Sequence, residues 1–62
     1  MAWLAIDKDG TEVIYDFKPV RPLNGNKWDI ATDSSWFINL PKGTIEKIIG
    51  INLTWEDEPV KI

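Results

Sequence analysis

The sequence predicts an α+β domain in which a small, mostly antiparallel sheet is covered by one short helix. Apolar and polar residues alternate in several short segments such as residues 36–40, the period of a half-buried strand. Ile45, Ile48 and Ile49 recur at the helical spacing i, i+3, i+4. Strand patterns lie on both sides of this helix, so the predicted order is β-β-(β)-β-α-β. A small all-β barrel, in which residues 44–49 form only a turn, is the structural alternative.

The length and composition fit one small domain, residues 1–62, near the lower size limit for independent folding. The chain contains no Cys and no His, so thiolate and imidazole ligands are lacking, and we expect no cofactor and no metal. An apolar fraction of 44% that includes four Trp is available to build the core. Small scaffolds also gain buried area by self-association, so a homo-oligomer stays open as an alternative.

Charge and hydropathy restrict the classes of partner. The net charge is −3 and the isoelectric point is about 4.6, which argues against direct nucleic-acid binding, because a polyanion requires a basic face. No apolar run reaches the roughly 18 residues that a membrane span requires. The N-terminus also lacks the basic region and cleavage site of a signal peptide. We therefore expect a cytoplasmic protein without membrane contacts.

The first elements are predicted to form a hairpin. Residues 3–6 are apolar and residues 11–17 alternate, with a polar turn between them. Asp7, Asp9 and Gly10 also resemble the start of a calcium-binding EF-hand loop. In that loop glycine is sixth and glutamate twelfth, whereas here glycine is fourth and the twelfth residue is lysine. A plain hairpin turn is the favoured interpretation.

Residues 18–35 are predicted to form an irregular loop. Pro19 and Pro22 each fix their own backbone and restrict the residue before them, so this part runs extended. Within the loop, residues 27–31 alternate around Trp28 and are expected to add a short strand.

The segment of residues 36–40 is predicted to be a strand that turns Trp36, Ile38 and Leu40 toward the core. Phe37 and Asn39 then lie on its other side. Pro41 ends the strand, because proline cannot donate to a sheet ladder.

The helix that follows has start and stop signals. Gly43 or Thr44 is the expected N-cap, and Gly50 is placed to end the helix in the left-handed conformation. Residues 51–55 alternate again and predict a strand after the helix, and residues 60–62 predict a terminal strand.

The residues that catalysis usually requires are missing from the sequence, so we expect a protein that is not an enzyme. A Ser nucleophile requires a base, usually His, so Ser34 and Ser35 are interpreted as turn residues. The sequence around Gly43 has the wrong order for a phosphate-binding loop.

The tryptophans are the most informative candidates for a binding site. Trp3, Trp36 and Trp55 are in phase with apolar strand positions, which predicts that they belong to the core. Trp28 has polar neighbours, so we interpret it either as a core residue or as an exposed partner-binding residue, since Trp is enriched at interface hot spots.

The second candidate is an acidic tract formed by Glu56, Asp57 and Glu58. Such a tract is usually a solvated turn, but it could also form a negative patch that meets a basic partner and speeds association. Trp28, Glu56, Asp57 and Glu58 are therefore the predicted partner-binding residues.

Both ends of the chain resemble a known group of proteins. The motifs are W-L-A-I-D-K-D-G at residues 3–10, L-P-K-G-T-I-E-K-I-I-G at residues 40–50 and L-T-W-E-D-E-P-V at residues 53–60. They resemble short uncharacterised proteins from bacteriophage, prophage and gut-bacterial genomes. The resemblance leaves residues 18–35 unassigned, and it implies a genomic setting rather than a chemical activity.

These observations lead to one hypothesis and two alternatives. The first is a non-catalytic protein-interaction protein of phage or mobile-element type. The alternatives are an acidic nucleic-acid mimic that inhibits a host DNA- or RNA-binding enzyme, and a self-assembling structural subunit whose exposed edge pairs with its own copies.

Overall fold

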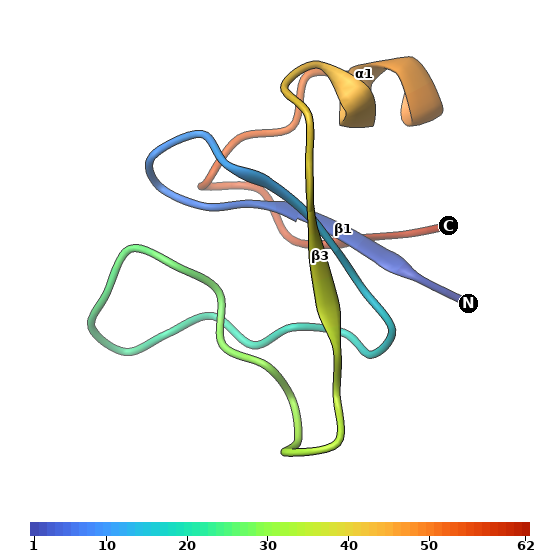
Figure 1. The fold of residues 1–62 in the computed structure, drawn as a ribbon. Helices are drawn as coiled ribbons and strands as arrows, with labels where there is room; N and C mark the ends of the chain where they lie inside the picture. Colours follow the sequence, from blue (N-terminus) through green and yellow to red (C-terminus); the bar gives the residue numbers. More distant parts are fainter.

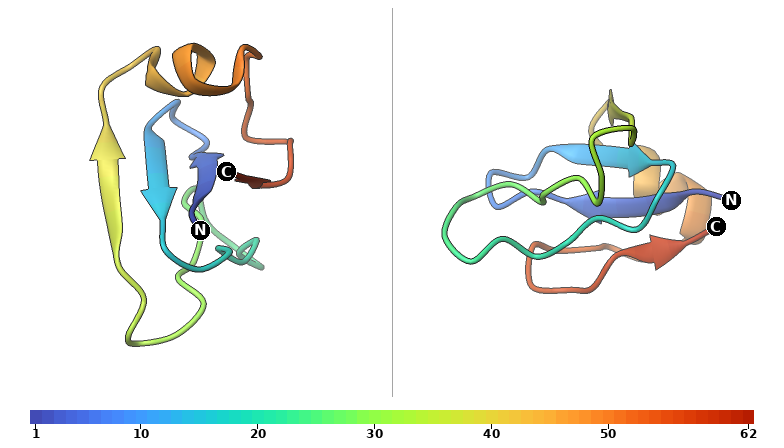
Figure 2. Two further views of the ribbon diagram at one scale, coloured as in Figure 1. Left: turned by 90° about the vertical axis from the view of Figure 1, so that its right-hand side faces the viewer. Right: turned by 90° about the horizontal axis from the view of Figure 1, so that it is seen from below.

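A computed structural model describes all 62 residues and contains a four-stranded antiparallel sheet and one helix (Figure 1). The elements are β1 (Trp3–Ile6), β2 (Glu12–Tyr15), β3 (Phe37–Leu40), α1 (Thr44–Ile49) and β4 (Val60–Lys61). The strand order is β3-β2-β1-β4, and Figure 2 shows α1 lying across one end of the sheet. The predicted α+β class is confirmed. The sheet is not closed, so the barrel alternative is wrong.

The predicted hairpin is formed by β1 and β2, which pair with Leu4 opposite Ile14. The turn closes with a hydrogen bond from the Gly10 N–H to the Asp7 carbonyl, at 2.9 Å, and Gly10 has φ of 93°. Glycine suits this position because it adopts positive φ without steric cost. The Thr11 N–H donates to the Asp9 carboxylate, at 2.9 Å, and this bond lowers the pKa of Asp9 below its usual value.

Helix α1 begins after Gly43 and ends before Gly50, and both glycines are left-handed, with φ of 90° and 77°. The predicted caps are therefore confirmed. The backbone N–H groups at the N-terminal end of the helix donate to a side chain of the sheet. The Glu12 carboxylate accepts the Gly43 N–H at 2.6 Å and the Ile45 N–H at 2.8 Å. Since the first N–H groups of a helix have no partner within it, Glu12 fixes α1 to β2.

The sheet has two apolar faces because side chains alternate along each strand. The face under α1, named the helix face, packs Leu4 of β1 against Ile45 and Leu53. The opposite face, named the tryptophan face, packs Ala5, Val13, Tyr15 and Trp28, together with Trp3 and Trp55.

The loop of residues 18–35 covers the tryptophan face, on the side of the sheet away from α1 (Figures 1 and 2). It is irregular, as predicted. The strand expected at residues 27–31 does not form, because only an isolated bridge joins Val20 to Asp29, with N···O distances of 2.8 and 2.9 Å. The loop is tied to the hairpin turn instead, since the Lys8 N–H donates to the Asn26 carbonyl at 2.9 Å.

The strand predicted at residues 51–55 is also not formed. Leu53 is buried against the helix face, but the backbone around it has no strand beside it. The reason is the pairing of β1, whose two edges are taken by β2 and by the terminal strand β4. The predicted strand at the C-terminus is confirmed at Val60–Lys61.

The strand predicted at residues 36–40 forms as β3, but its expected burial is wrong. Trp36 and Ile38 were expected in the core and are 51% and 56% exposed, and only Leu40 packs against the helix face. Helix α1 lies over one end of the sheet and leaves the remainder of β3 uncovered (Figure 2). In α1 itself, Ile45 is buried, Ile49 is half-buried and Ile48 is exposed. No helix in the chain is long and apolar enough to span a bilayer.

The Glu12 cap leads to a stability prediction. Glu12→Ala should lower the free energy of unfolding by about 2–3 kcal/mol, because it leaves two helix N–H groups without their charged acceptor. Glu12→Gln keeps one acceptor oxygen and should cost about 1 kcal/mol. Urea denaturation followed by circular dichroism measures both values. The control is Glu46→Gln in the exposed first turn of α1, and equal effects of Glu12→Ala and Glu46→Gln would contradict the assigned cap.

Candidate functional site

Trp28, the first predicted site residue, lies inside the protein. It is 6% exposed, so of the two interpretations of Trp28 the core residue is correct and the exposed position that partner binding required is not found. Its indole N–H donates to the Ile6 carbonyl at 2.9 Å, and its backbone N–H donates to the Asp7 carboxylate at 3.1 Å. Its ring packs edge-on against Trp55, with centroids 5.6 Å apart. Its polar sequence neighbours suggested exposure, but the neighbours that decide its burial come from distant parts of the chain.

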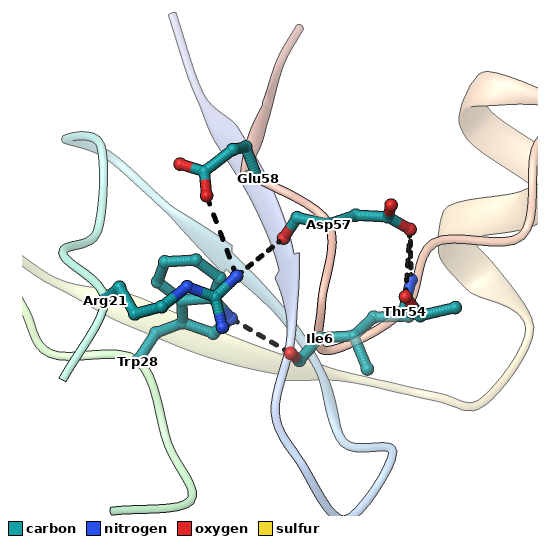
Figure 3. Close-up of polar contacts among 6 residues, drawn as sticks. All are labelled: Ile6, Arg21, Trp28, Thr54, Asp57 and Glu58. Carbon is teal, nitrogen blue, oxygen red and sulfur yellow. Dashed lines mark hydrogen bonds and ion pairs between the residues drawn. The ribbon is translucent and has the colours of Figure 1, made fainter. Parts of the chain in front are cut away.

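Arg21 lies over the ring of Trp28 (Figure 3) and also close to that of Trp55. Its guanidinium carbon lies 4.2 Å from the centroid of Trp28 and 4.9 Å from that of Trp55. The same guanidinium donates to the Asp57 carbonyl at 3.3 Å and forms an ion pair with Glu58 at 3.7 Å. The contact joins the loop of residues 18–35 to the C-terminal turn, and each exposed ion pair or cation–π contact of this kind is worth about 0.5–1 kcal/mol.

The three residues of the acidic tract do not act together. The Asp57 carboxylate accepts the backbone N–H of Thr54 at 2.8 Å and its hydroxyl at 3.0 Å, which closes a turn. Glu58 pairs with Arg21, while Glu56 is exposed and forms no hydrogen bond or ion pair. The structure therefore brings Trp28, Asp57 and Glu58 together through Arg21, in an arrangement that stabilises the fold (Figure 3).

The feature that sequence analysis missed is the outer edge of β3. The Asp16 N–H donates to the Trp36 carbonyl at 3.4 Å, and hydrogen-bonded pairs alternate along an antiparallel ladder. The N–H and carbonyl groups of Phe37 and Asn39 therefore point away from β2. No backbone bond to these groups exists elsewhere, since β3 pairs only with β2. We name these four groups, with the exposed side chains beside them, the β3 edge.

The side chains at the β3 edge are apolar on both faces of the sheet. Phe37 is 53% exposed on the tryptophan face, and Trp36 and Ile38 are exposed on the helix face. The strand contains no charged residue, no proline and no bulge, which are the devices that usually protect an edge from pairing. The opposite edge differs, because β4 has only two residues and one of them is Lys61. One edge is therefore protected and the other is open.

Asp7 is an unusual buried group beside this surface. Its side chain is buried, and desolvation raises its pKa above the usual value despite the hydrogen bond from Trp28. A carboxyl group with a raised pKa binds its proton more tightly in the folded state than in the unfolded state. Stability from this group is therefore full at low pH and is lost as the pH rises through the folded pKa.

The position of Trp28 leads to a prediction with a matched control. Trp28→Phe should lower the free energy of unfolding by about 1–3 kcal/mol, because it removes the bond to Ile6 and leaves space in the core. The same substitution at exposed Trp36 should change it by no more than about 0.5 kcal/mol. Urea denaturation of the two variants makes the comparison. A larger effect at Trp36 than at Trp28 would show that their burial has been assigned the wrong way round.

The burial of Asp7 leads to a prediction of pH dependence. Asp7→Asn keeps an oxygen that accepts the Trp28 N–H but removes the charge. The stability of this variant relative to the wild type should increase as the pH rises from about 4 toward 7, since only the wild type must bury a carboxylate. Urea denaturation at several pH values gives the difference, in which the other titrating groups cancel. If the difference in stability between Asp7→Asn and the wild type stays constant over this pH range, the raised pKa of Asp7 is contradicted.

Comparisons of this chain with protein-family models, curated proteins and solved structures found no match. The function proposed for it therefore depends on the geometry of its own residues.

Proposed function

We propose that this chain is a non-catalytic protein-interaction protein that binds an extended segment of a partner protein as a fifth strand along the β3 edge. The carrying observation is the row of four unpaired backbone groups on Phe37 and Asn39. Added strands bind by main-chain hydrogen bonds, and the side chains next to the edge set their specificity. The exposed side chains of Trp36, Phe37 and Ile38 supply apolar contact on both faces of such a strand.

The partner surface in this proposal differs from the one predicted by sequence. Trp28 is buried, and Asp57 and Glu58, although exposed, form contacts with other residues of the chain, so the exposed apolar edge replaces them in the proposal. The same contacts give no support to the nucleic-acid mimic, because a mimic requires free carboxylates spaced along one face. The proposed setting is the cytoplasm of a cell that carries a phage or mobile element, in keeping with the resemblance of the two ends of the chain.

Self-assembly is the second candidate, because β3 could pair with β3 of another copy around a two-fold axis through Ile38. In that pairing Phe37 would lie opposite Asn39 of the second copy. The net charge of −3 on each copy opposes such a contact, whereas it favours a basic partner.

Proline at the edge tests the proposal. Asn39→Pro removes one outward N–H without breaking the ladder to β2, because proline is tolerated on the open side of an edge strand. Asn39→Thr is the matched control, since it also loses the amide side chain but keeps the N–H. Tagged wild-type protein and both variants are used to capture partners from host lysate for mass spectrometry, after circular dichroism has confirmed that each is folded.

The expected result is one partner that the wild type and Asn39→Thr retain and Asn39→Pro loses. Equal capture by all three proteins would place the contact elsewhere and contradict the proposal. Light scattering over a concentration series measures the oligomeric state and so distinguishes self-assembly from binding of a different protein. A wild-type dimer that Asn39→Pro converts to a monomer would favour self-assembly.

A further inference from the structure

A small cavity opens on the tryptophan face next to the β3 edge. Its volume is about 130 Å³, and its lining includes Val13 and Tyr15 of β2 and Phe37 and Asn39 of β3. The two residues from β3 are those whose backbone groups are unpaired. A strand docked on the edge would place the side chains opposite Phe37 and Asn39 on this same face of the sheet. The cavity is therefore within reach of alternate residues of a bound segment.

The Tyr15 hydroxyl has no hydrogen-bond partner in the protein. The side chain is 3% exposed, and buried Tyr hydroxyl groups usually have a partner. No side-chain polar atom that is sealed from solvent lacks a hydrogen bond, so the Tyr15 hydroxyl is accessible, and Tyr15 is one of the residues that line the cavity. Asp7 lines the same cavity, and of its two carboxylate oxygens only one accepts a hydrogen bond. The residues that line the cavity thus include two with an oxygen that accepts no hydrogen bond from the protein.

The charge around the cavity is predominantly negative. Burial raises the pKa of Tyr15 to about 12, and the nearby carboxylates of Asp7 and Asp29 add to this effect. Asp9 acts on Asp7 in the same direction. Lys27 is the one cation that lines the cavity, and it is an exposed residue that can turn toward solvent. Asp7 and Lys27 are the two charged residues that line the cavity, and Asp9 and Asp29 add negative charge close to it. Since Asp7 is buried and Lys27 is exposed, the fixed charge at the cavity favours a cationic occupant.

Three of the eight residues that line the cavity are aromatic. Tyr15 and Phe37 lie with ring centroids 5.9 Å apart and planes inclined by 38°, and Trp28 contributes a third ring. Aromatic faces attract cations, and the planar guanidinium group stacks on them especially well. The molecule already holds one guanidinium against Trp28, that of Arg21 (Figure 3).

The size of the cavity also agrees with a planar group of this kind. An engineered cavity of about 150 Å³ in another protein holds benzene. A guanidinium group is planar and smaller than benzene, so about 130 Å³ is sufficient for it. It carries five donors and no acceptor, which matches the carboxylate oxygen of Asp7 and the hydroxyl oxygen of Tyr15 as acceptors.

We propose that this cavity receives the arginine side chain of the partner strand that docks on the β3 edge. The inference rests on the proposed function and deepens it. Backbone pairing with Phe37 and Asn39 would hold the segment, and the guanidinium would hydrogen-bond to Asp7 and Tyr15 among the three aromatic rings. The expected partner segment carries arginine on one face of the strand and an apolar residue, packed against Ile38, on the other.

The test uses a labelled eight-residue peptide in which threonine alternates with valine and arginine replaces one central threonine. The matched peptide has citrulline at that place, which keeps the shape of arginine and removes its charge. Fluorescence anisotropy with the full chain should give about tenfold tighter binding for the arginine peptide, the size expected for charge-assisted hydrogen bonds. A third peptide with glutamate there should bind more weakly than either.

Variants of the chain test whether the arginine of the peptide contacts Tyr15 and Asp7. Tyr15→Phe keeps the ring in the core and removes only the unpartnered hydroxyl, so it should remain folded. Both Tyr15→Phe and Asp7→Asn should reduce the preference for arginine over citrulline by roughly 3- to 10-fold. Lys27→Gln should increase it by roughly 2-fold, since it removes the opposing charge.

The outcomes separate the two proposals. If the arginine and citrulline peptides bind equally and Asn39→Pro abolishes both, the edge binds strands and the assignment of the cavity is overturned. If the glutamate peptide binds best, the cavity takes an acidic side chain through Lys27, and the assignment is also overturned. If no peptide binds, or Asn39→Pro binds all of them as the wild type does, the proposed function itself fails.

Discussion

The structure depends on covering two apolar faces of a short sheet with a chain that has only one helix. Helix α1 covers the helix face, and the loop of residues 18–35 must cover the other without regular structure. Trp28 makes this possible because it supplies a large apolar ring and two N–H groups that donate hydrogen bonds. Its ring fills the space over Ala5 and Val13, and its two N–H groups donate to Ile6 and Asp7. An irregular segment would otherwise leave polar backbone groups unpaired against the core.

The helix depends on the sheet in a similar way. Six residues are too few for a helix that is stable by itself, so α1 requires both tertiary packing and a capped start. Ile45 provides the packing, and the buried carboxylate of Glu12 provides the cap. A charge is costly to bury unless its oxygens are paired, and here both of them accept an N–H group. The central strand β2 thereby sets the position of the helix as well as the pairing of its neighbours.

The two edges of the sheet differ, and the cavity lies next to the open one. The edge at β4 is short and carries Lys61, whereas the edge at β3 is open and apolar. Next to the open edge lie Asp7, whose burial is unfavourable for its charged form, and the unpartnered hydroxyl of Tyr15. Groups held in unfavourable environments are found preferentially at functional sites. Their position beside the open edge supports the proposal that this side of the sheet binds a partner.

The sequence by itself determined the elements that depend on nearby residues. The hairpin with its glycine turn, the helix between Gly43 and Gly50, and the α+β class follow from local periodicity and backbone preference. Tertiary structure alone decided burial and pairing. Residues 51–55 alternate like a strand but lack a partner, because β4 occupies the edge of β1. Likewise, Trp36 is exposed although its alternation predicted burial, and Trp28 is buried although its neighbours left both positions open. Alternation defines the two sides of a strand, but whether a side is covered depends on segments that arrive from elsewhere in the chain. For the same reason the candidate site, an uncovered edge, could not be predicted from its own residues.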